Sequence, residues 1–186
     1  SVNFSSNAQS VIEGDLGNTP VTVTASLSAI SSQTVTVPFT LSGSANNPAD
    51  HNAVNGSITI PAGSTSGSTS FNVIGDALDE PDETVIFTMG SPTNATAGTT
   101  TSHTVTITDD DAAPSVNFTA SGQSVIDGDI GNTAVSVSAS LSTISSRTVT
   151  VPFTLSGTAT GGGIDHNAVN GSISIPAGSL SASTGF

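Results

Sequence analysis

The chain has 186 residues, of which fourteen are acidic and one, Arg147, is basic, so its net charge is −13 at pH 7. A chain with a single basic residue cannot neutralise a run of phosphates, which argues against nucleic-acid binding and against docking on an anionic membrane surface. It contains no Cys, which excludes a disulfide framework and Cys-based zinc sites. No run approaches the roughly 18 apolar residues of a membrane-spanning helix.

The chain contains two copies of one repeat. Residues 1–43 match residues 115–157 at 32 of 43 positions, and residues 51–64 match residues 166–179 at 13 of 14. The offset between the copies is 114 residues and rises to 115 after an insertion within Thr158–Ile164. We therefore expect a complete domain over 1–113 and a partial second domain over 114–186, which stops at the counterpart of Phe71.

Apolar residues recur with a period of two, which is typical of strands with one buried face. Thr and Val fill these runs, and turn residues such as Asn55-Gly56 separate them. In chain order the strands are expected at 2–12 (with a break near the middle), 21–27, 34–41, 57–60, 69–74, 84–89 and 103–108. Seven short strands in about 110 residues predict an all-β fold, a tandem of immunoglobulin-like antiparallel β-sandwiches with the second copy incomplete.

The acidic residues gather in the loops at one end of the predicted sandwich. Successive strands of an antiparallel sandwich alternate in direction, so the loops after the first, third, fifth and seventh strands share one end. Those loops hold all fourteen acids: Glu13, Asp15, Asp50, Asp76, Asp79, Glu80, Asp82, Glu83, Asp109, Asp110 and Asp111, and in the second copy Asp127, Asp129 and Asp165. Acids that only keep a protein soluble would be spread over both ends.

Convergent carboxylates without nearby basic residues predict a hard divalent cation. The densest stretches are 76–83, with five acids in eight residues, and the run 109–111. Calcium takes six to eight oxygen ligands from flexible loops, so it is the leading candidate. Magnesium demands a tighter octahedral geometry but stays open, whereas zinc is disfavoured by the absence of Cys and the scattered His residues.

The motifs of the unit resemble those of the Calx-beta domain, the calcium-binding sandwich of sodium–calcium exchangers and many bacterial extracellular proteins. The matching segments are 10–15 (Ser-Val-Ile-Glu-Gly-Asp), 35–39 (Val-Thr-Val-Pro-Phe), 44–50, 58–63 (Ile-Thr-Ile-Pro-Ala-Gly), 79–84 (Asp-Glu-Pro-Asp-Glu-Thr) and 105–111 (Val-Thr-Ile-Thr-Asp-Asp-Asp). The resemblance implies calcium ligands at Glu13, Asp50, Asp76, Glu80, Glu83, Asp109, Asp110 and Asp111. Asp127 and Asp165 occupy the positions of Glu13 and Asp50 in the second copy and complete the expected metal residues.

Three histidines are interpreted as non-ligands. His51 and its repeat His166 stand where the resembled family usually has an aromatic residue after the Asp, so we expect them to pack or to form hydrogen bonds. His103 is expected to be an ordinary surface residue at the start of a strand.

No catalytic constellation is apparent, so the chain is not expected to be an enzyme. The resemblance implies a calcium-binding structural repeat of a large extracellular or cell-surface protein, such as an adhesin, a surface-layer protein or a filament. Its partners would be calcium ions and neighbouring repeats or copies in a fibre, with calcium neutralising the acidic end and stiffening the joint to the next copy. A regulatory calcium sensor and a carbohydrate- or protein-binding module that uses the acid-free end remain as alternatives.

The second copy has no counterpart of residues 72–113. Its segment 149–155 would then be an open edge, which is an adhesive liability. We expect strands from a continuing polypeptide or from a neighbouring chain to complete it.

Overall fold

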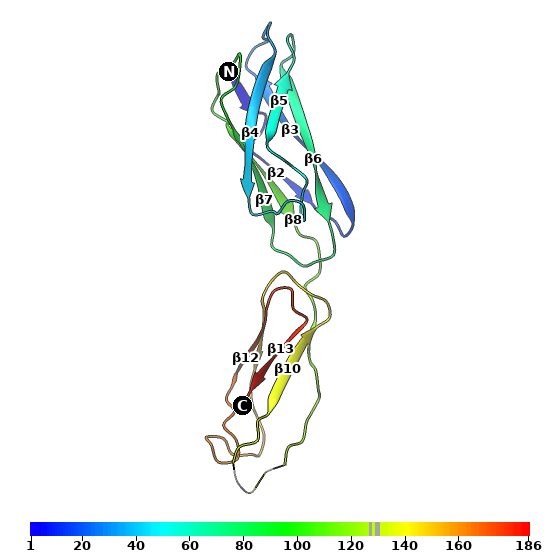
Figure 1. Ribbon diagram of the computed structural model, residues 1–186, viewed down its shortest axis with the longest axis vertical. Coiled ribbons are helices and arrows are strands. Elements are labelled where there is room, and N and C mark those ends of the chain that lie inside the picture. Colours follow the sequence, from blue (N-terminus) through cyan, green and yellow to red (C-terminus); the bar gives the residue numbers. More distant parts are fainter. Residues whose placement is uncertain (127, 129–130) are drawn as a thin grey trace. The chain divides into compact units, whose positions relative to one another are not determined.

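The structure, a computed structural model, describes residues 1–126, 128 and 131–186. These residues divide into two compact units, the first formed by Ser1–Ala77 and Pro81–Asp111 and the second by Leu78–Glu80 and Ala112–Phe186. Every regular element in the described residues is a β-strand, which confirms the predicted fold class (Figure 1). None of the described residues forms a helix that could cross a membrane.

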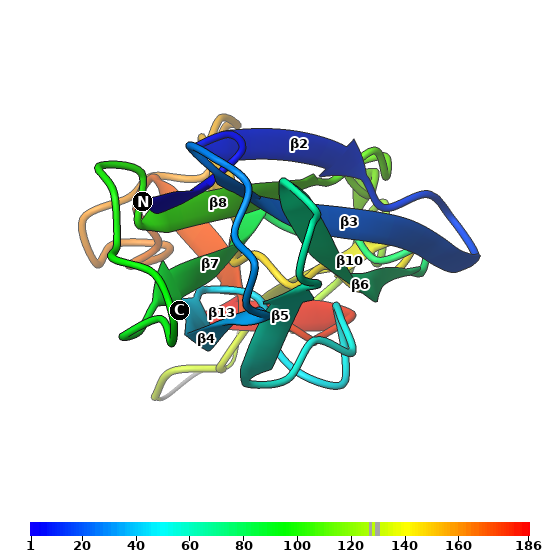
Figure 2. The ribbon, with the colours of Figure 1, turned by 90° about the horizontal axis from the view of Figure 1, so that it is seen from above.

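The first unit is a sandwich of two sheets. Its strands are β1 (Val2–Phe4), β2 (Ala8–Ile12), β3 (Gly17–Leu27), β4 (Val35–Gly43), β5 (Gly56–Ile60), β6 (Ser66–Gly75), β7 (Glu83–Met89) and β8 (Ser102–Thr108). One sheet has the order β1-β3-β6 and the other β2-β8-β7-β4-β5. Figure 2 shows β2, β8, β7 and β4 following one another in a row. All seven predicted runs are therefore strands.

The first predicted strand breaks at Ser5–Asn7, and its halves join different sheets. β1 pairs antiparallel with β3, whereas β2 pairs parallel with β8. This parallel pair departs from the predicted antiparallel arrangement. The physical reason is that the chain crosses between the sheets without reversing its direction, so β2 lies beside the last strand of the unit and runs the same way.

The period-two alternation predicted from the sequence builds one core between the sheets. Val21, Val23 and Ala25 of β3 face inward together with Val35 and Val37 of β4, while the Thr residues between them are more exposed. Aromatic rings join the two layers, since the ring of Phe87 in β7 lies 5.0 Å from that of Phe39 in β4 and 5.7 Å from that of Phe71 in β6. The sandwich is thus held by burial of one face of each sheet.

The second unit has five strands in two smaller sheets. They are β9 (Val116–Phe118), β10 (Ser136–Leu141), β11 (Val149–Phe153), β12 (Gly171–Ile175) and β13 (Ser181–Gly185). The sheet orders are β13-β10-β9 and β11-β12. The buried cluster of the described residues contains Ala139, Leu141, Ile173 and Ile175, a much smaller core than that of the first unit. Strands completing this unit from elsewhere remain a prediction.

Replacing Phe87 by Ala tests the importance of the aromatic contact between the sheets. The Phe87 side chain is 1% exposed and the cavity cannot collapse easily, so Phe87→Ala should lower the free energy of unfolding by about 3–5 kcal/mol. Phe118→Ala is the matched control, because Phe118 is 51% exposed and should lose far less. Urea denaturation measures both, and equal losses would contradict the assigned core.

Candidate metal centre

The ends of β2, β4 and β8 bring acidic residues together at one end of the first unit. β2 runs parallel to β8, and both β4 and β8 run antiparallel to β7, so all three strands finish at the same end of their sheet. In the other sheet β6 finishes at that end as well (Figure 1). The loops that follow these strands carry the acidic residues, as predicted for the first copy.

The first acidic group consists of Glu13, Asp109 and Asp111. One carboxylate oxygen from each lies within 4.8 Å of the others. The parallel register pairs Ile12 with Thr108, so the next residues, Glu13 and Asp109, leave the sheet side by side. The Glu13 amide donates to the Thr108 carbonyl oxygen at 3.2 Å, which continues the ladder into the group.

A glycine turn places Asp110 beside the first group. Gly14 has a φ of +77°, a conformation that L residues with side chains rarely adopt, and it turns the chain directly after Glu13. Its amide donates to Oδ1 of Asp110 at 3.0 Å. Asp110 is exposed and lies outside the group of three, so its role in the structure is to tie the loop after β8 to the loop after β2.

The second acidic group consists of Asp50, Glu80 and Glu83, again with one oxygen from each within 4.8 Å of the others. Asp50 is buried in the middle of the loop between β4 and β5, and its Oδ2 accepts a hydrogen bond from the Asn46 amide at 2.5 Å. Glu83 opens β7 and Glu80 precedes it in the loop.

The end of β4 is held close to the start of β7, which sets the spacing of the second group. Gly43 pairs with Val85, and a Cβ atom at Gly43 would collide with the Thr84 carbonyl oxygen. The Thr84 amide donates to Oγ of Ser44 at 3.0 Å, and the Ala45 amide donates to the Thr84 carbonyl oxygen at 3.1 Å. The backbone thus fixes the approach of the loop that carries Asp50.

The remaining predicted metal residues lie outside both groups. Asp76 is exposed directly after β6. Asp165, the counterpart of Asp50, is exposed, and its Oδ2 accepts a hydrogen bond from the Thr160 amide at 2.7 Å within its own loop. Asp127 lies outside the described residues. The described part of the second unit therefore brings no group of three acids together.

The electrostatic field of the acidic end acts on Asp111. Burial raises the pKa of its carboxyl group above the ordinary value, and the negative charges of Asp109, Asp15, Asp110 and Asp76 raise it further. Asp15 and Asp76 thus belong to the environment of the first group although neither is one of its three members. Among the described residues, Oδ2 of Asp111 is a buried oxygen atom without a hydrogen-bond partner.

These groups can bind a cation. Each offers carboxylate oxygens from two different loops at close spacing, which is the arrangement that hard divalent ions require. Asp111 offers an oxygen that no hydrogen bond occupies in the described structure, and the unfavourable crowding of negative charge around it would be relieved by a bound cation.

His51 does not serve as a ligand in this arrangement. It is buried, its Nδ1 accepts a hydrogen bond from the Ala53 amide at 3.0 Å, and its ring meets Phe71 edge-on at 6.1 Å. Burial lowers the pKa of the imidazole, against the opposing effects of a backbone hydrogen bond at Ala45 and the charge of Asp50. The expected packing and hydrogen-bonding role of His51 agrees with this geometry.

The expectation for His103 was wrong. His103 is 3% exposed, and its Nδ1 lies 2.9 Å from the Ser6 carbonyl oxygen. The rings of Phe4 and Phe87 lie 6.1 Å and 6.4 Å from the imidazole. The segment joining β1 to β2 covers this side chain, a contact that a position at the start of a strand does not reveal.

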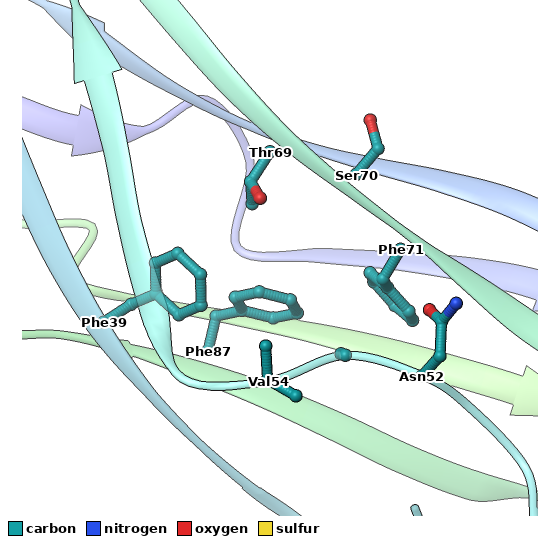
Figure 3. Close-up of a pocket in the computed structure, with 8 residues that line it drawn as sticks. Phe39, Asn52, Val54, Thr69, Ser70, Phe71 and Phe87 are labelled. Atoms are coloured by element: carbon teal, nitrogen blue, oxygen red, sulfur yellow. The ribbon is translucent and has the colours of Figure 1, made fainter. Parts of the chain in front are cut away.

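The first unit also contains a small pocket between its sheets, with both aromatic and polar residues in its lining. Phe39, Phe71 and Phe87 line it together with the segment 52–54 (Figure 3). Its volume is about 90 Å³, well below the roughly 300–1,000 Å³ of pockets that hold drug-sized ligands. Asn52, Thr69 and Ser70 are the polar residues of its lining.

Comparisons with solved structures show the fold. The structure of CBD12 from CALX1.2 matches with a TM-score of 0.54 and 21% identity, over 99% of this chain and 74% of that chain. The calcium binding domain CBD12 of CALX1.1 matches with a TM-score of 0.54 and 20% identity, over 100% and 74%. The apo form of the Calx CBD1 domain matches with a TM-score of 0.52 and 22% identity, over 59% and 96%.

Sequence comparisons point to the same family. None of the curated proteins compared with the chain matches it. The model of the Calx-beta domain matches twice, over residues 1–111 and 109–181, and so accounts for nearly the whole chain. The chain therefore belongs to the Calx-beta domain family.

Proposed function

We propose that the chain is a calcium-binding structural repeat of a large extracellular or cell-surface protein, such as an adhesin, a surface-layer protein or a filament. The observation that carries the proposal is the convergence of two groups of three carboxylates at one end of a Calx-beta sandwich. Calcium would bind Glu13, Asp109 and Asp111 in one site and Asp50, Glu80 and Glu83 in the other. Backbone carbonyl groups, water or the nearby Asp76 and Asp110 would supply further oxygen ligands.

The chemistry of the donors favours calcium over other metals. All the side chains in the two groups are carboxylates, the chain has no Cys, and Nδ1 of His51 already accepts a hydrogen bond. Zinc prefers nitrogen and sulfur ligands, whereas calcium accepts an irregular shell of oxygens from several loops. The likeness to the calcium binding domain CBD12 of CALX1.1 supports the same choice.

A structural role in a calcium-rich setting agrees with the composition. Extracellular modules function with dissociation constants of about 10⁻⁴–10⁻³ M, so partly exposed sites suffice there. A cytosolic sensor needs values of about 10⁻⁷–10⁻⁵ M. Tandem copies and an acidic, Cys-free sequence support a spacing or fibre-building role rather than catalysis. A titration separates the sensor from the structural repeat by its affinity.

Calcium should stabilise the first unit. An ion present at 100 times its dissociation constant adds about 2.7 kcal/mol to the free energy of unfolding. For a unit of this size that corresponds to a rise of about 10 °C or more in Tm. Thermal melting in chelator and in millimolar calcium measures the difference, and identical Tm values would rule the calcium sites out.

The substitution Asp111→Asn should raise the free energy of unfolding without calcium and lower it with calcium. Because the folded state raises the Asp111 pKa, the ionised carboxylate destabilises the metal-free fold at neutral pH. The protonated carboxyl group of Asp111 stabilises the folded state relative to the ionised one. This contribution is fully present below the ordinary pKa of 3.8 and is lost as the pH rises through the raised pKa of the folded state. In chelator, Asp111→Asn should therefore stabilise the chain at pH 7 and have little effect below pH 3.8.

In saturating calcium the same variant should be less stable than the wild type, because it lacks a charged ligand. Asp165→Asn is the matched control, since Asp165 is exposed and lies outside both groups. Denaturant unfolding at pH 7 and below pH 3.8, each with and without calcium, measures the free energy of unfolding under the four conditions. If Asp111→Asn destabilises the chain under every condition, Asp111 is a structural residue and not a metal ligand.

Calcium should also stiffen the joint between successive copies. Asp109–Asp111 end the first copy, and only Ala112, Ala113 and Pro114 separate them from the second. Binding at the first group would order this short connection. Small-angle X-ray scattering of a chain with several copies should give a greater maximum dimension in calcium than in chelator, and no change would restrict the ion to stabilising single domains.

A further inference from the structure

The outer edge of β6 in the first unit carries backbone groups that β3 does not pair with. β6 is an edge strand of the sheet β1-β3-β6, and residues alternate along such a strand between facing the neighbouring strand and facing away from it. Asn72 faces away from β3, because its carbonyl oxygen accepts a hydrogen bond from the Asn52 amide at 3.1 Å and its amide donates to Oδ1 of Asn52 at 2.7 Å. The backbone groups of Ser70 and Ser68, two and four residues earlier, therefore face the same outer side.

The chain's own segment 50–52 covers only the last part of this edge. It runs antiparallel to β6, and the Ile74 amide donates to the Asp50 carbonyl oxygen at 2.9 Å. Among the described residues, no hydrogen bond satisfies the backbone amide or carbonyl group of Ser68 or Ser70. Both serines are exposed. Two amides and two carbonyl groups on this edge are therefore available to another strand.

This part of β6 also lacks the features that usually keep other strands away from an exposed edge. Charged residues, prolines and β-bulges perform that task in many sheets. Residues 66–71 read Ser-Gly-Ser-Thr-Ser-Phe and so include no charge and no proline. The pairing of β6 with β3 runs without a bulge from Ser66 to Gly75. Nothing in the local sequence therefore opposes the addition of a strand.

The pocket between the sheets adjoins the same part of β6. Thr69, which lies between the two serines, is half-buried and lines the pocket together with the rings of Phe39, Phe71 and Phe87 (Figure 3). The three rings are buried. Val54 also lines the pocket, yet it is 70% exposed, so it marks the side on which the pocket meets the solvent. An unpaired edge and an aromatic pocket thus lie next to each other.

The size of the pocket and the geometry of the strand define what can enter. The pocket has a volume of about 90 Å³, whereas an apolar cavity of about 150 Å³ holds a benzene molecule. The pocket is therefore suited to one aliphatic side chain, such as that of Val or Leu, rather than to an aromatic one. Residues directly opposite each other on paired strands share a face of the sheet. A partner residue opposite Thr69 would consequently point into the pocket.

We propose that the edge of β6 at Ser68–Ser70 and the adjoining pocket bind an extended segment of another protein, in which an aliphatic residue stands between two polar ones. The two polar residues would exchange backbone hydrogen bonds with Ser68 and Ser70, and the aliphatic side chain would enter the pocket. Addition of a strand to a sheet edge, with a pocket that selects alternate side chains, is a general mode of peptide recognition. The site requires no metal ion, so the proposal goes beyond calcium binding.

Other occupants suit this site less well. An incoming strand continues the pairing that segment 50–52 already makes with the same edge of β6. A free apolar molecule would fill the pocket but would leave the backbone groups of Ser68 and Ser70 without partners. A charged side chain would lose its hydration against three aromatic rings. A second copy that paired its own β6 here about Thr69 would offer a hydroxyl-bearing side chain in place of an aliphatic one.

The test adds the synthetic peptide acetyl-Gly-Ser-Thr-Leu-Thr-Ser-Gly-amide to the full 186-residue chain. Binding should saturate at one peptide per chain, and hydrogen exchange followed by NMR should slow about tenfold or more at the amides of Ser68 and Ser70. Exchange at the Thr69 amide, which faces β3, should change little. The same peptide with Asp in place of its central Leu should not bind, because a carboxylate is not stable in the aromatic pocket.

Two variants of the chain separate the pocket from the rest of the surface. Val54→Asp places a charge at the mouth of the pocket on an exposed position, so it should weaken binding of the Leu peptide about tenfold or more and leave the fold intact. Val169→Asp is the matched control, since Val169 is the counterpart of Val54 and is also 70% exposed. Equal binding by the two variants, equal binding of the two peptides, or no slowing at Ser68 and Ser70 in excess peptide would overturn the proposal. Dimers that protect these two amides without peptide would overturn it in favour of a second copy.

Discussion

The parallel pairing of β2 with β8 is the constraint on which the acidic end depends. Its register places Glu13 next to Asp109 as the two strands leave the sheet. Carboxylates held this close repel each other, because each carries a negative charge. The backbone ladder, the Gly14 turn and the buried core hold these charges together. A divalent cation bound between the carboxylates would therefore relieve their mutual repulsion.

The acidic end differs between the two copies of the repeat, because it depends on which strands are neighbours. At the acidic end, pairing of β4 with β7 places Asp50 near Glu83, as pairing of β2 with β8 places Glu13 near Asp109. In the second unit the described residues include no strand in the position of β7, and there the counterpart of Asp50, Asp165, is exposed and bonds within its own loop. In the first unit one strand, β7, both packs Phe87 against Phe39 and carries Glu83 of the second acidic group.

Much of the candidate site could be predicted because its residues follow strand ends. Glu13, Glu83 and Asp109 adjoin predicted strands, and Asp50 lies in the loop between two of them, so counting strand directions was enough to place them at one end. The grouping into two sets was not predictable, since it depends on which strands are neighbours within the sheet. The burial of His103 was missed for a similar reason, because its cover comes from Ser5–Asn7, about 97 residues earlier in the chain.

The sequence by itself determined the all-β class, the repeat, the strand positions of the first unit and the excess of acid at one end. These are local properties, since alternation selects which side of a strand is apolar and turn residues mark where it ends. Only the tertiary structure decided the parallel course of β2, the membership of each acidic group and the different lengths of β4 and β11. The physical reason is that a strand is completed by hydrogen bonds and burial from a partner elsewhere in the chain, so residues 35–43 and 149–157 form different structures from the same nine side chains.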